Sequence, residues 1–342
     1  MKYYTFLFFV PLIICSCDNT KGEQKAIVTA EIVQGVAQGT TYSIKYNGEH
    51  KVTKLEIDSV LRGIDLSLSA WVDESTLTAF NNSDSITVKD PHFLTVFYRS
   101  EEVYDVTGGA FQPMIMPLTR AWGFGPEGGQ VKNDINIDSI RTLVNFDVVA
   151  LPNENSQSVT FLKKAGRQLD VNGIAQGYSV DVVAEFLERR GIVNYMVEIG
   201  GELRAKGKNE KGELWRIGVD KPSSTLNERT LEVIITLENS SLATSGSYRK
   251  FYEKNGRKFS HTIDPQTGEP VIHNLLSVTV LASNCTSADA FATAFMVQGV
   301  KGTQDFLAHH PELDLSVYMI YDENGEMKTY ASEKILALIE DV

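Results

Sequence analysis

Two polar side chains four residues apart, Asp289 and Thr293, have the types and spacing of ligands for a hard cation. They lie in a run expected to be helical from Ala288 to Gln298, and positions four apart share one face of a helix. A carboxylate beside a hydroxyl suits Mg²⁺, because this ion takes oxygen ligands and keeps waters or phosphate oxygens in its shell. The structural alternative is that Asp289 caps the helix and Thr293 only packs.

The segment before this helix carries further groups that could do chemistry. His261 is either a hydrogen-bonded core histidine or, beside Asp264 and Asp289, a general base. Arg249 is either a phosphate clamp or half of a structural ion pair. Ser245 has no nucleophile elbow around it, which argues against a serine hydrolase.

A third group lies upstream, where Asp170 ends a strand-like run and Gly173 and Gly177 punctuate the start of the next helix. The amino end of a helix attracts anions, so this segment is suited to an anion or a metal-bound phosphate. The glycine spacing is not that of the dinucleotide fingerprint. Farther upstream, Gly108 and Gly109 permit a positive φ or the close approach of a ligand.

The elements that must position these residues mix strands and helices without strict alternation. This is typical of an α+β fold with mixed, largely antiparallel sheets and packed helices. Apolar spacing predicts amphipathic helices at 52–68 and, started by Asp90-Pro91, near 93–104. Strands are expected at 195–199, 215–219, 231–237, 251–259, 276–281 and 315–321, and a terminal helix at 333–339.

Composition limits the class of function. The chain has 342 residues, 42% of them hydrophobic, which is enough for a large core in one domain or two intimate ones. A net charge of -12 without a Lys/Arg block repels phosphate backbones, so we expect no nucleic acid partner. Two of the three cysteines lie near the N-terminus, so no disulfide framework or cysteine metal site is predicted, and Cys285 is expected to be buried and inert.

The N-terminus is typical of an exported protein. An apolar run from Tyr3 to Ile14 is too short to span a bilayer and suits a signal peptide. The segment Ile14-Cys15-Ser16-Cys17 resembles a bacterial lipobox, and acyl chains on Cys17 would give a stable membrane anchor. We therefore expect a lipoprotein signal peptide at 1–16, a lipid-anchored tether at 17–30 and one domain at 31–342, facing the periplasm. The alternative is a plain secretory signal.

The motifs together resemble the ApbE family, the FAD:protein FMN transferases. The matching segments, in the order of the family, are Gln38 to Tyr42, Ser75 to Asn81, Gly108 to Phe111, Trp122 to Gly125, Asp170 to Gly177, Glu198 to Glu202, Ala243 to Arg249, Ser260 to Gly268 and Ser287 to Thr293. The resemblance covers nearly all of the chain from about residue 31. Any one segment is weak, and the ordered set is specific.

The resemblance implies an FAD cleft between two intimate subdomains. Members of the family take FAD, need Mg²⁺, split the pyrophosphate and attach FMN through a phosphoester bond to a Thr or Ser of a target protein, which releases AMP. The expected acceptors are flavoprotein subunits of membrane redox complexes, namely the sodium-pumping NADH:quinone reductase (Nqr) and Rnf-type complexes. Some members also hydrolyse FAD to FMN and AMP.

Carried over by motif position, the resemblance also implies site residues. Mg²⁺ would be held by Asp289, Thr293 and the backbone carbonyl of Gly173. The positions expected to contact FAD are Gln38, Trp71, Ala110, Phe111, Gln112, Asp170, Gln176 and Ile263. The Trp71 ring can stack on a flat ring system, and His261 is our hypothesis for the base that deprotonates the acceptor hydroxyl. By this resemblance, Asp289 would act in catalysis through the metal.

Four positions depart from the pattern of the family, which commonly has Met at Gln38, Tyr at Trp71, Asp at Gln112 and Lys at Gln176. The last two changes remove charges near the ligand. Two alternatives therefore stand beside the transferase: an Mg²⁺-dependent FAD pyrophosphatase that gives FMN and AMP, and a lipoprotein that binds FAD without turnover. The metal-site matches are intact, which favours the transferase.

Overall fold

The architecture is described from a computed structural model. It covers residues 30–128, 136–153, 156–222, 230–247, 251–254, 257–260 and 262–340, with only the backbone described at 251–254 and 257–260.

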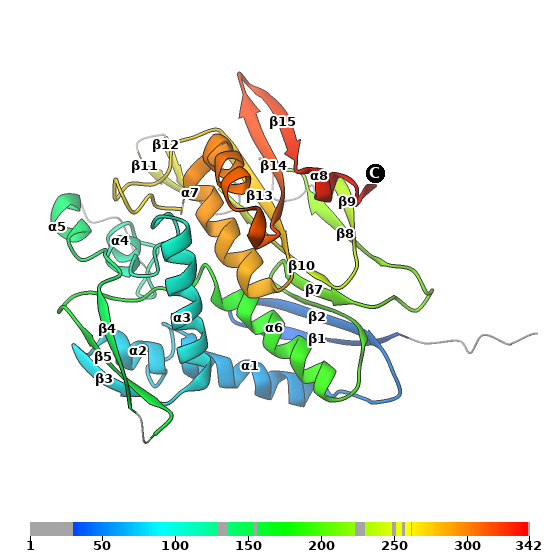
Figure 1. The fold of residues 1–342 in the computed structure, drawn as a ribbon, viewed down its shortest axis with the longest axis horizontal. Helices are drawn as coiled ribbons and strands as arrows, with labels where there is room; N and C mark the ends of the chain where they lie inside the picture. Colours follow the sequence, from blue (N-terminus) through cyan, green and yellow to red (C-terminus); the bar gives the residue numbers. More distant parts are fainter. Residues whose placement is uncertain are drawn as a thin grey trace, which may run out of the picture.

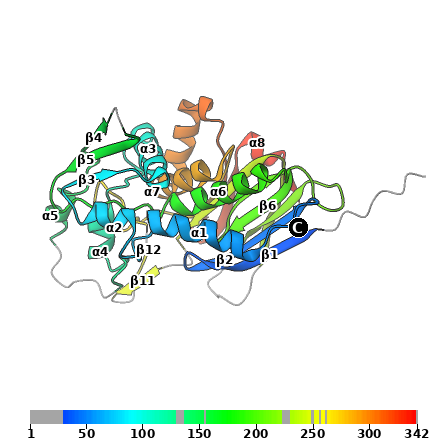
Figure 2. The ribbon, with the colours of Figure 1, turned by 90° about the horizontal axis from the view of Figure 1, so that it is seen from below.

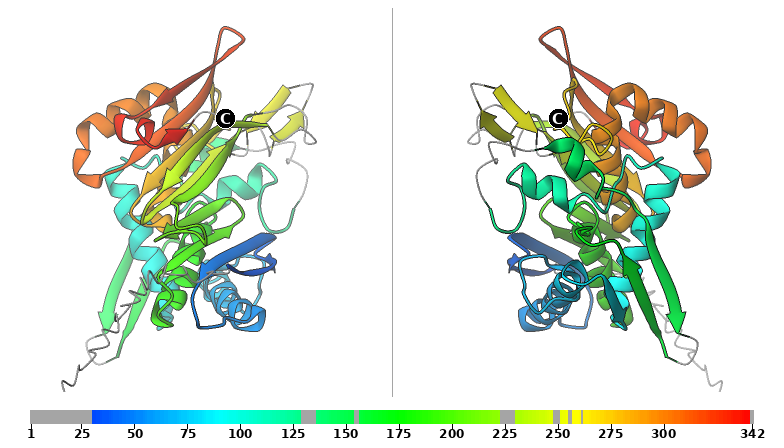
Figure 3. Two further views of the ribbon diagram at one scale, coloured as in Figure 1. Left: turned by 90° about the vertical axis from the view of Figure 1, so that its right-hand side faces the viewer. Right: turned by 90° about the vertical axis from the view of Figure 1, so that its left-hand side faces the viewer.

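The fold is built on one large sheet, in which each neighbouring pair of strands is antiparallel. Its strands, in spatial order, are β1 (Glu31–Ala37), β2 (Thr40–Asn47), β6 (Asn194–Ile199), β7 (Glu202–Lys206), β10 (Ser240–Gly246), β13 (Leu275–Ala282), β14 (Ser316–Glu323) and β15 (Glu326–Ala331). The hairpin β14–β15 projects beyond the rest of the molecule (Figure 3).

Helices α1, α6 and α7 cover one face of this sheet, with α1 and α6 side by side over the strands β1, β2 and β6 (Figure 2). The helices are α1 (Lys54–Leu68), α2 (Thr76–Asn81), α3 (Pro91–Val106), α4 (Met116–Ala121), α5 (Ile137–Arg141), α6 (Ala175–Arg189), α7 (Cys285–His309) and α8 (Glu333–Leu336), with a 3₁₀ turn at Pro311–Leu313.

Local sequence explains why α1 and α3 form where they do. Thr53 and Glu56 make a reciprocal capping box at the start of α1, and its buried face comprises Ile57, Leu61, Ile64 and Leu68. At the start of α3 the Asp90 carboxylate accepts the backbone N–H groups of His92 and Phe93, with proline in the first turn.

The main core lies between this helical layer and the sheet. On β2 the side chains of Tyr42, Ile44 and Tyr46 alternate toward it and are nearly inaccessible to solvent. The Tyr42 hydroxyl donates a hydrogen bond of 2.6 Å to the Asp58 carboxylate of α1, which ties the helix to the sheet. The core therefore fixes α1 and α6 over the first strands.

A second core lies on the opposite face of the sheet. There a small antiparallel sheet covers β7, β10, β13 and β14 with apolar residues, among them Trp215, Ile235 and Leu237 against Leu203 and Leu242. Its strands are β8 (Trp215–Asp220), β9 (Leu231–Leu237) and β16 (Ile339–Glu340).

The remaining strands form two smaller units. One is a sheet of β3 (Ser85–Val88), β5 (Ser158–Lys163) and β4 (Val148–Asn153), and the other is the hairpin of β11 (Phe251–Lys254) and β12 (Arg257–Ser260). An aromatic cluster joins the three-stranded sheet to α2 and α3. Its closest ring pair, Phe97 and Phe161, has centroids 4.6 Å apart. This cluster is continuous with the main core. Figure 1 shows the small sheet beside α2 and α3.

Helix α7 is longer than the predicted run from Ala288 to Gln298. It starts at Cys285, because Asn284 caps it by accepting the Ser287 N–H. It continues beyond Gln298 through a kink at Gly299, whose φ of 69° is left-handed. The Met296 carbonyl near this kink accepts a hydrogen bond of 2.7 Å from Nε2 of His273, while Nδ1 of the same ring accepts the Leu275 N–H.

The predicted α+β class with largely antiparallel sheets is confirmed by this topology. Sequence reasoning missed β10, because Thr244 and Ser245 have a polar pattern while their strand is paired between β7 and β13. It also extended the terminal helix too far: α8 ends at Leu336, and Ile339 belongs to β16. In both places the neighbouring strands override local preference.

None of the helices within the described ranges has the length and apolarity needed to cross a bilayer.

Candidate active site

The contact between α6 and α7 brings together two of the predicted site segments. The Gly177 N–H of α6 donates a hydrogen bond of 2.9 Å to Oδ2 of Asp289 on α7. A Cβ atom at Gly177 would lie 2.3 Å from the Cys285 carbonyl oxygen and 2.7 Å from Cβ of Asp289. Glycine is therefore required by close approach at this point.

The loop before α6 adds a third group. The Gly173 carbonyl oxygen lies 3.4 Å from Oγ1 of Thr293, and Asp289 is one helical turn away on the same face of α7. This separation is close to the roughly 3 Å between adjacent ligands of an octahedral Mg²⁺. The three predicted metal ligands are thus neighbours.

The donor set fits Mg²⁺, because carboxylate, hydroxyl and carbonyl groups all present hard oxygens. It contains a single carboxylate, Asp289, and the described part of the chain holds no group of three or more Asp, Glu, His or Cys that could bind a metal. A cation at this point would therefore need water and the phosphate oxygens of a ligand to complete its shell.

Asp289 is only 5% exposed, and burial raises its pKa from 3.8 to about 7, against the hydrogen bond from Gly177. The folded state thus favours the neutral acid. The stability that this group contributes is complete below pH 4 and is lost as the pH rises through about 7.

We predict that this titration is visible in the unfolding of the metal-free protein. Between pH 4 and pH 8, the Tm of the wild type should decrease relative to the Tm of Asp289→Asn by at least about 5 °C. Asparagine keeps the acceptor for Gly177 but cannot ionise, so it is the matched control. Thermal melts at several pH values test this, and a difference that does not change with pH would contradict it.

Two predicted FAD contacts lie where α6 meets the large sheet: Gln38 in the turn between β1 and β2, and Gln176 in the first turn of α6. Nε2 of Gln38 donates to Oγ of Ser179 at 2.9 Å, and Gln38 also hydrogen-bonds the Asp65 carboxyl. Nε2 of Gln176 donates to the Ile199 carbonyl at 3.1 Å and lies where a Cβ on Gly200 would be. Both amides hold the sheet against the helix.

Asp170 is 9% exposed and is surrounded by polar partners. Its carboxylate accepts the Asn172 N–H at 3.0 Å and the Thr119 hydroxyl at 3.2 Å. Burial raises the pKa of Asp170, and these hydrogen bonds together with Arg120 oppose that rise. The preceding residue, Leu169, is held through its backbone N–H and C=O by the side chain of Asn81. This pairing explains the polar end of the motif Ser75 to Asn81.

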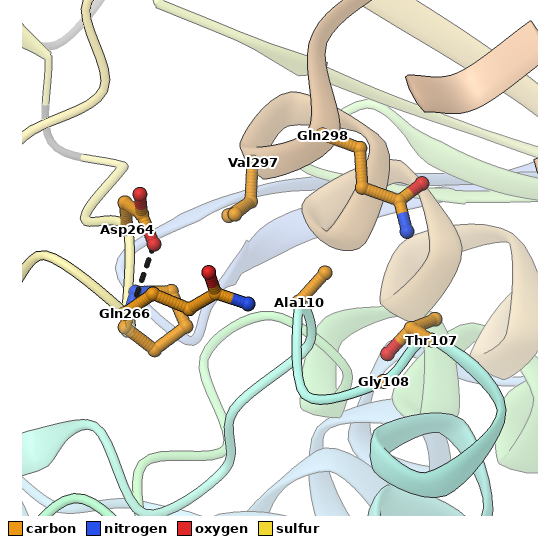
Figure 4. A pocket seen from close by; sticks show the side chains of 8 residues that line it. Thr107, Gly108, Ala110, Asp264, Gln266, Val297 and Gln298 are labelled. Atoms are coloured by element: carbon orange, nitrogen blue, oxygen red, sulfur yellow. Dashed lines mark hydrogen bonds between the residues drawn. The ribbon is translucent and has the colours of Figure 1, made fainter.

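A cavity of about 230 Å³ lies next to Ala110, between three parts of the fold (Figure 4). One wall comes from the residues after α3, one from the turn at Asp264, whose carboxylate accepts the Gln266 N–H, and one from α7. The lining residues are Thr107, Gly108, Ala110, Asp264, Pro265, Gln266, Val297 and Gln298. The loop at its edge is held by Trp122, which donates from Nε1 to the Gly268 carbonyl at 2.8 Å.

Helix α7 connects this cavity to the cation ligands. Asp289, Thr293 and Val297 follow at intervals of four on one face, so the cavity begins roughly 12 Å along the helix from Asp289. An extended ligand with phosphates at one end and a ring at the other could therefore contact both.

Other predicted FAD contacts are less accessible. Phe111 is 3% exposed and belongs to the main core, and Gln112 is 9% exposed with its Oε1 accepting the Met114 N–H. Ile263 is buried beside the cavity turn. Trp71 is the opposite case: it is 58% exposed in the loop between α1 and α2, and its indole makes no ring contact or hydrogen bond to another described residue.

Three predicted residues, namely His261, Arg249 and Cys17, lie outside the described residues. Sequence reasoning also missed two residues that contact the site. Asp181, four residues after Gly177, reaches the start of α7, and Gln298 lines the cavity. The carboxylate among the apolar positions of α6 was a sequence signal for Asp181. No local sequence pattern indicates Gln298.

Comparison with known proteins identifies the family of this chain. The profile of the ApbE family matches residues 38–317. The FAD:protein FMN transferase of Haemophilus influenzae is 35% identical, with 90% of this chain and 91% of that protein covered, and that of Vibrio cholerae is 36% identical, with 88% and 90% covered.

Solved structures give the same result. The flavin transferase ApbE from Vibrio cholerae superimposes with a TM-score of 0.76 at 34% identity, over 91% of this chain and all of that one. The flavinyl transferase ApbE of Pseudomonas stutzeri in its apo form gives 0.78 at 29% identity, over 91% and 97%. The family profile, the similar sequences and the shared fold agree, and this chain belongs to the ApbE family.

Proposed function

We propose that this protein is an Mg²⁺-dependent FAD:protein FMN transferase. It would move the FMN part of FAD to a Thr or Ser hydroxyl of an acceptor protein and release AMP. The observation that carries the proposal is the convergence of Gly173, Asp289 and Thr293 at the α6–α7 contact, in a member of the ApbE family.

We assign a role to each part of the site. The carboxylate of Asp289, the hydroxyl of Thr293 and the carbonyl of Gly173 would hold the cation, which when bound neutralises charge on the pyrophosphate oxygens. The residue before α6, Ile174, supplies no side-chain cap, and the Gly177 N–H of its first turn is held by Asp289, so the amino end of α6 lies beside the cation ligands and is suited to a metal-bound phosphate. The cavity at Ala110 and Gln298 is suited to one of the rings of FAD.

The acceptor hydroxyl must lose its proton as it attacks phosphorus. We assign this step to His261, which directly precedes the described loop that lines the cavity. The imidazole takes the proton, the new phosphoester bond forms on the acceptor, and the bond to AMP breaks. The turn at Asp264 and the bond from Trp122 to Gly268 would hold this loop in place.

The two glutamines that replace charged residues of the family pattern have structural partners. Gln112 accepts from Met114 and Gln176 donates to Ile199, so both amides are hydrogen-bonded within the protein. This supports an active enzyme in which binding of FAD rests on other contacts.

The proposal includes a location and a class of partner. A lipid anchor at Cys17 would hold the enzyme at the membrane, facing the periplasm. The acceptors would be flavoprotein subunits of membrane redox complexes of the Nqr and Rnf types. The support is the N-terminal sequence and the membership of the family.

The test is incubation of the chain from Asp18 onward with FAD and Mg²⁺, with and without a flavin-acceptor domain. We expect a fluorescent acceptor band on a denaturing gel, AMP in equal amount, and loss of both with EDTA. AMP without a band, even with several acceptors, would replace the transferase with an FAD pyrophosphatase. Bound FAD with neither product would leave a binding protein.

A further inference from the structure

We propose that Asp181 is a positioning residue for the cation site, because it sets the register between α6 and α7. The contacts that carry this inference are independent of any ligand, and its consequence for metal binding rests on the proposed function. Asp181 is 6% exposed and lies on α6, one turn after Gly177.

The Asp181 carboxylate caps the start of α7 from the side. Oδ1 accepts the Cys285 N–H at 3.0 Å, and Oδ2 accepts the Thr286 N–H at 2.8 Å and the Thr286 hydroxyl at 2.6 Å. A negative charge at the amino end of a helix is favourable, and these N–H groups have no partner within the helix. One side chain of α6 therefore holds the first turn of α7.

These contacts belong to a regular series. Gly173 faces Thr293, Gly177 faces Asp289, and Asp181 faces Cys285, so each step of four residues forward on the α6 side is matched by four backward on α7. Two antiparallel segments in one fixed register produce this pattern. In the first two contacts, Gly173 and Gly177 take part through their backbone atoms. In the third, Asp181 takes part through its side chain.

The register matters because cation ligands come from both sides of it. A slip of one residue moves Asp289 about 1.5 Å along the helix axis relative to Gly173. Mg²⁺ requires a near-ideal octahedron with ligand distances of roughly 2.0–2.1 Å. A displacement of this size would therefore pull Asp289 out of the coordination shell. The two glycines cannot resist such a slip through side-chain packing.

Arg204 of β7 connects this contact to the sheet. Its Nη1 lies 3.0 Å from Oδ1 of Asp181, and the same guanidinium reaches Glu188, a second carboxylate of α6, at 3.4 Å. Glu188 also bonds Lys206 and Tyr195. These contacts of Glu188 all go to the strands β6 and β7, which makes Glu188 the matched control.

The experiment compares Asp181→Asn with Glu188→Gln in the chain from Asp18 onward. Binding of Mn²⁺ is measured by the EPR signal of the free ion, with ADP present to supply pyrophosphate oxygens without an FMN group to transfer. We expect Asp181→Asn to weaken Mn²⁺ binding at least about tenfold and Glu188→Gln to change it less than about twofold. In the transferase assay the apparent KM for Mg²⁺ should rise for Asp181→Asn, with kcat restored at saturating Mg²⁺.

Thr286→Val keeps the test valid if Asp181→Asn does not fold. This change removes the hydroxyl donor from the α7 side and leaves the ion pair with Arg204, so we expect a loss of about threefold in Mn²⁺ affinity, in the same direction. Unchanged Mn²⁺ affinity in the folded variants would overturn the positioning role alone. A wild type that binds no Mn²⁺ with ADP would overturn the cation site of the proposed function as well.

Discussion

Replacing Asp289 with alanine should abolish both transfer of FMN to an acceptor and release of AMP from FAD, with each rate falling at least about 100-fold. The Asp289 carboxylate is the single charged group among the three predicted cation ligands. Without it, the hydroxyl of Thr293 and the carbonyl of Gly173 are neutral donors that bind Mg²⁺ weakly. The measurement is the initial rate of AMP release and of acceptor labelling at saturating FAD.

Two control variants separate loss of the metal from loss of the fold. Asp289→Asn retains an acceptor for the Gly177 N–H and should still be nearly inactive, because an amide carries no charge. Asp305→Asn changes an exposed carboxylate on the same helix, paired with Lys301 at the surface, and should keep normal activity. Full activity of Asp289→Ala with Mg²⁺ would refute the metal assignment.

The second large effect is expected from Gly177→Ala. In an ordinary helix this change stabilises by about 1 kcal/mol. Here the new methyl group would lie 2.3 Å from the Cys285 carbonyl oxygen. Because this oxygen belongs to the backbone, it can move only if the helix moves with it. We expect a loss of about 2–3 kcal/mol in the free energy of unfolding, together with loss of activity, because α7 must retreat from α6.

Gly63→Ala is the matched control for this prediction. Gly63 lies within α1, and nothing stands within 4 Å of the position that its Cβ would take. The same chemical change should stabilise the protein by up to about 1 kcal/mol at this site. Urea unfolding of both variants measures the two signs, and stabilisation by Gly177→Ala would show that the helices do not approach as closely as described.

Much of the scaffold could be predicted from local pattern. The apolar spacing of α1, the Asp90 cap of α3 and the mixture of strands and helices all indicated their structures correctly. Errors arose where partners distant in sequence decide the outcome. Thr244 lies in the central strand β10, and its hydroxyl shares a hydrogen bond with that of Thr279 in the neighbouring strand β13. No local sequence pattern reveals this pairing.

The candidate site shows the same division. Asp289 and Thr293 could be placed on one helical face from their spacing, whereas their proximity to Gly173 followed only from the resemblance to a family. The contact of Asp181 with α7 spans more than one hundred residues of sequence, so only the tertiary structure identifies it. The exposed position of Trp71 leaves its expected stacking with a ring as a prediction.

The single carboxylate at the α6–α7 contact has a thermodynamic consequence. If phosphate oxygens complete the shell of the cation, then substrate and cation each increase the affinity of the protein for the other, and by linkage the two factors are equal. Under the proposed function, departure of the phosphate-bearing product then loosens the cation at the end of each turnover. The rate would follow the free Mg²⁺ concentration of the surroundings, as it would not in a protein with a permanently loaded metal.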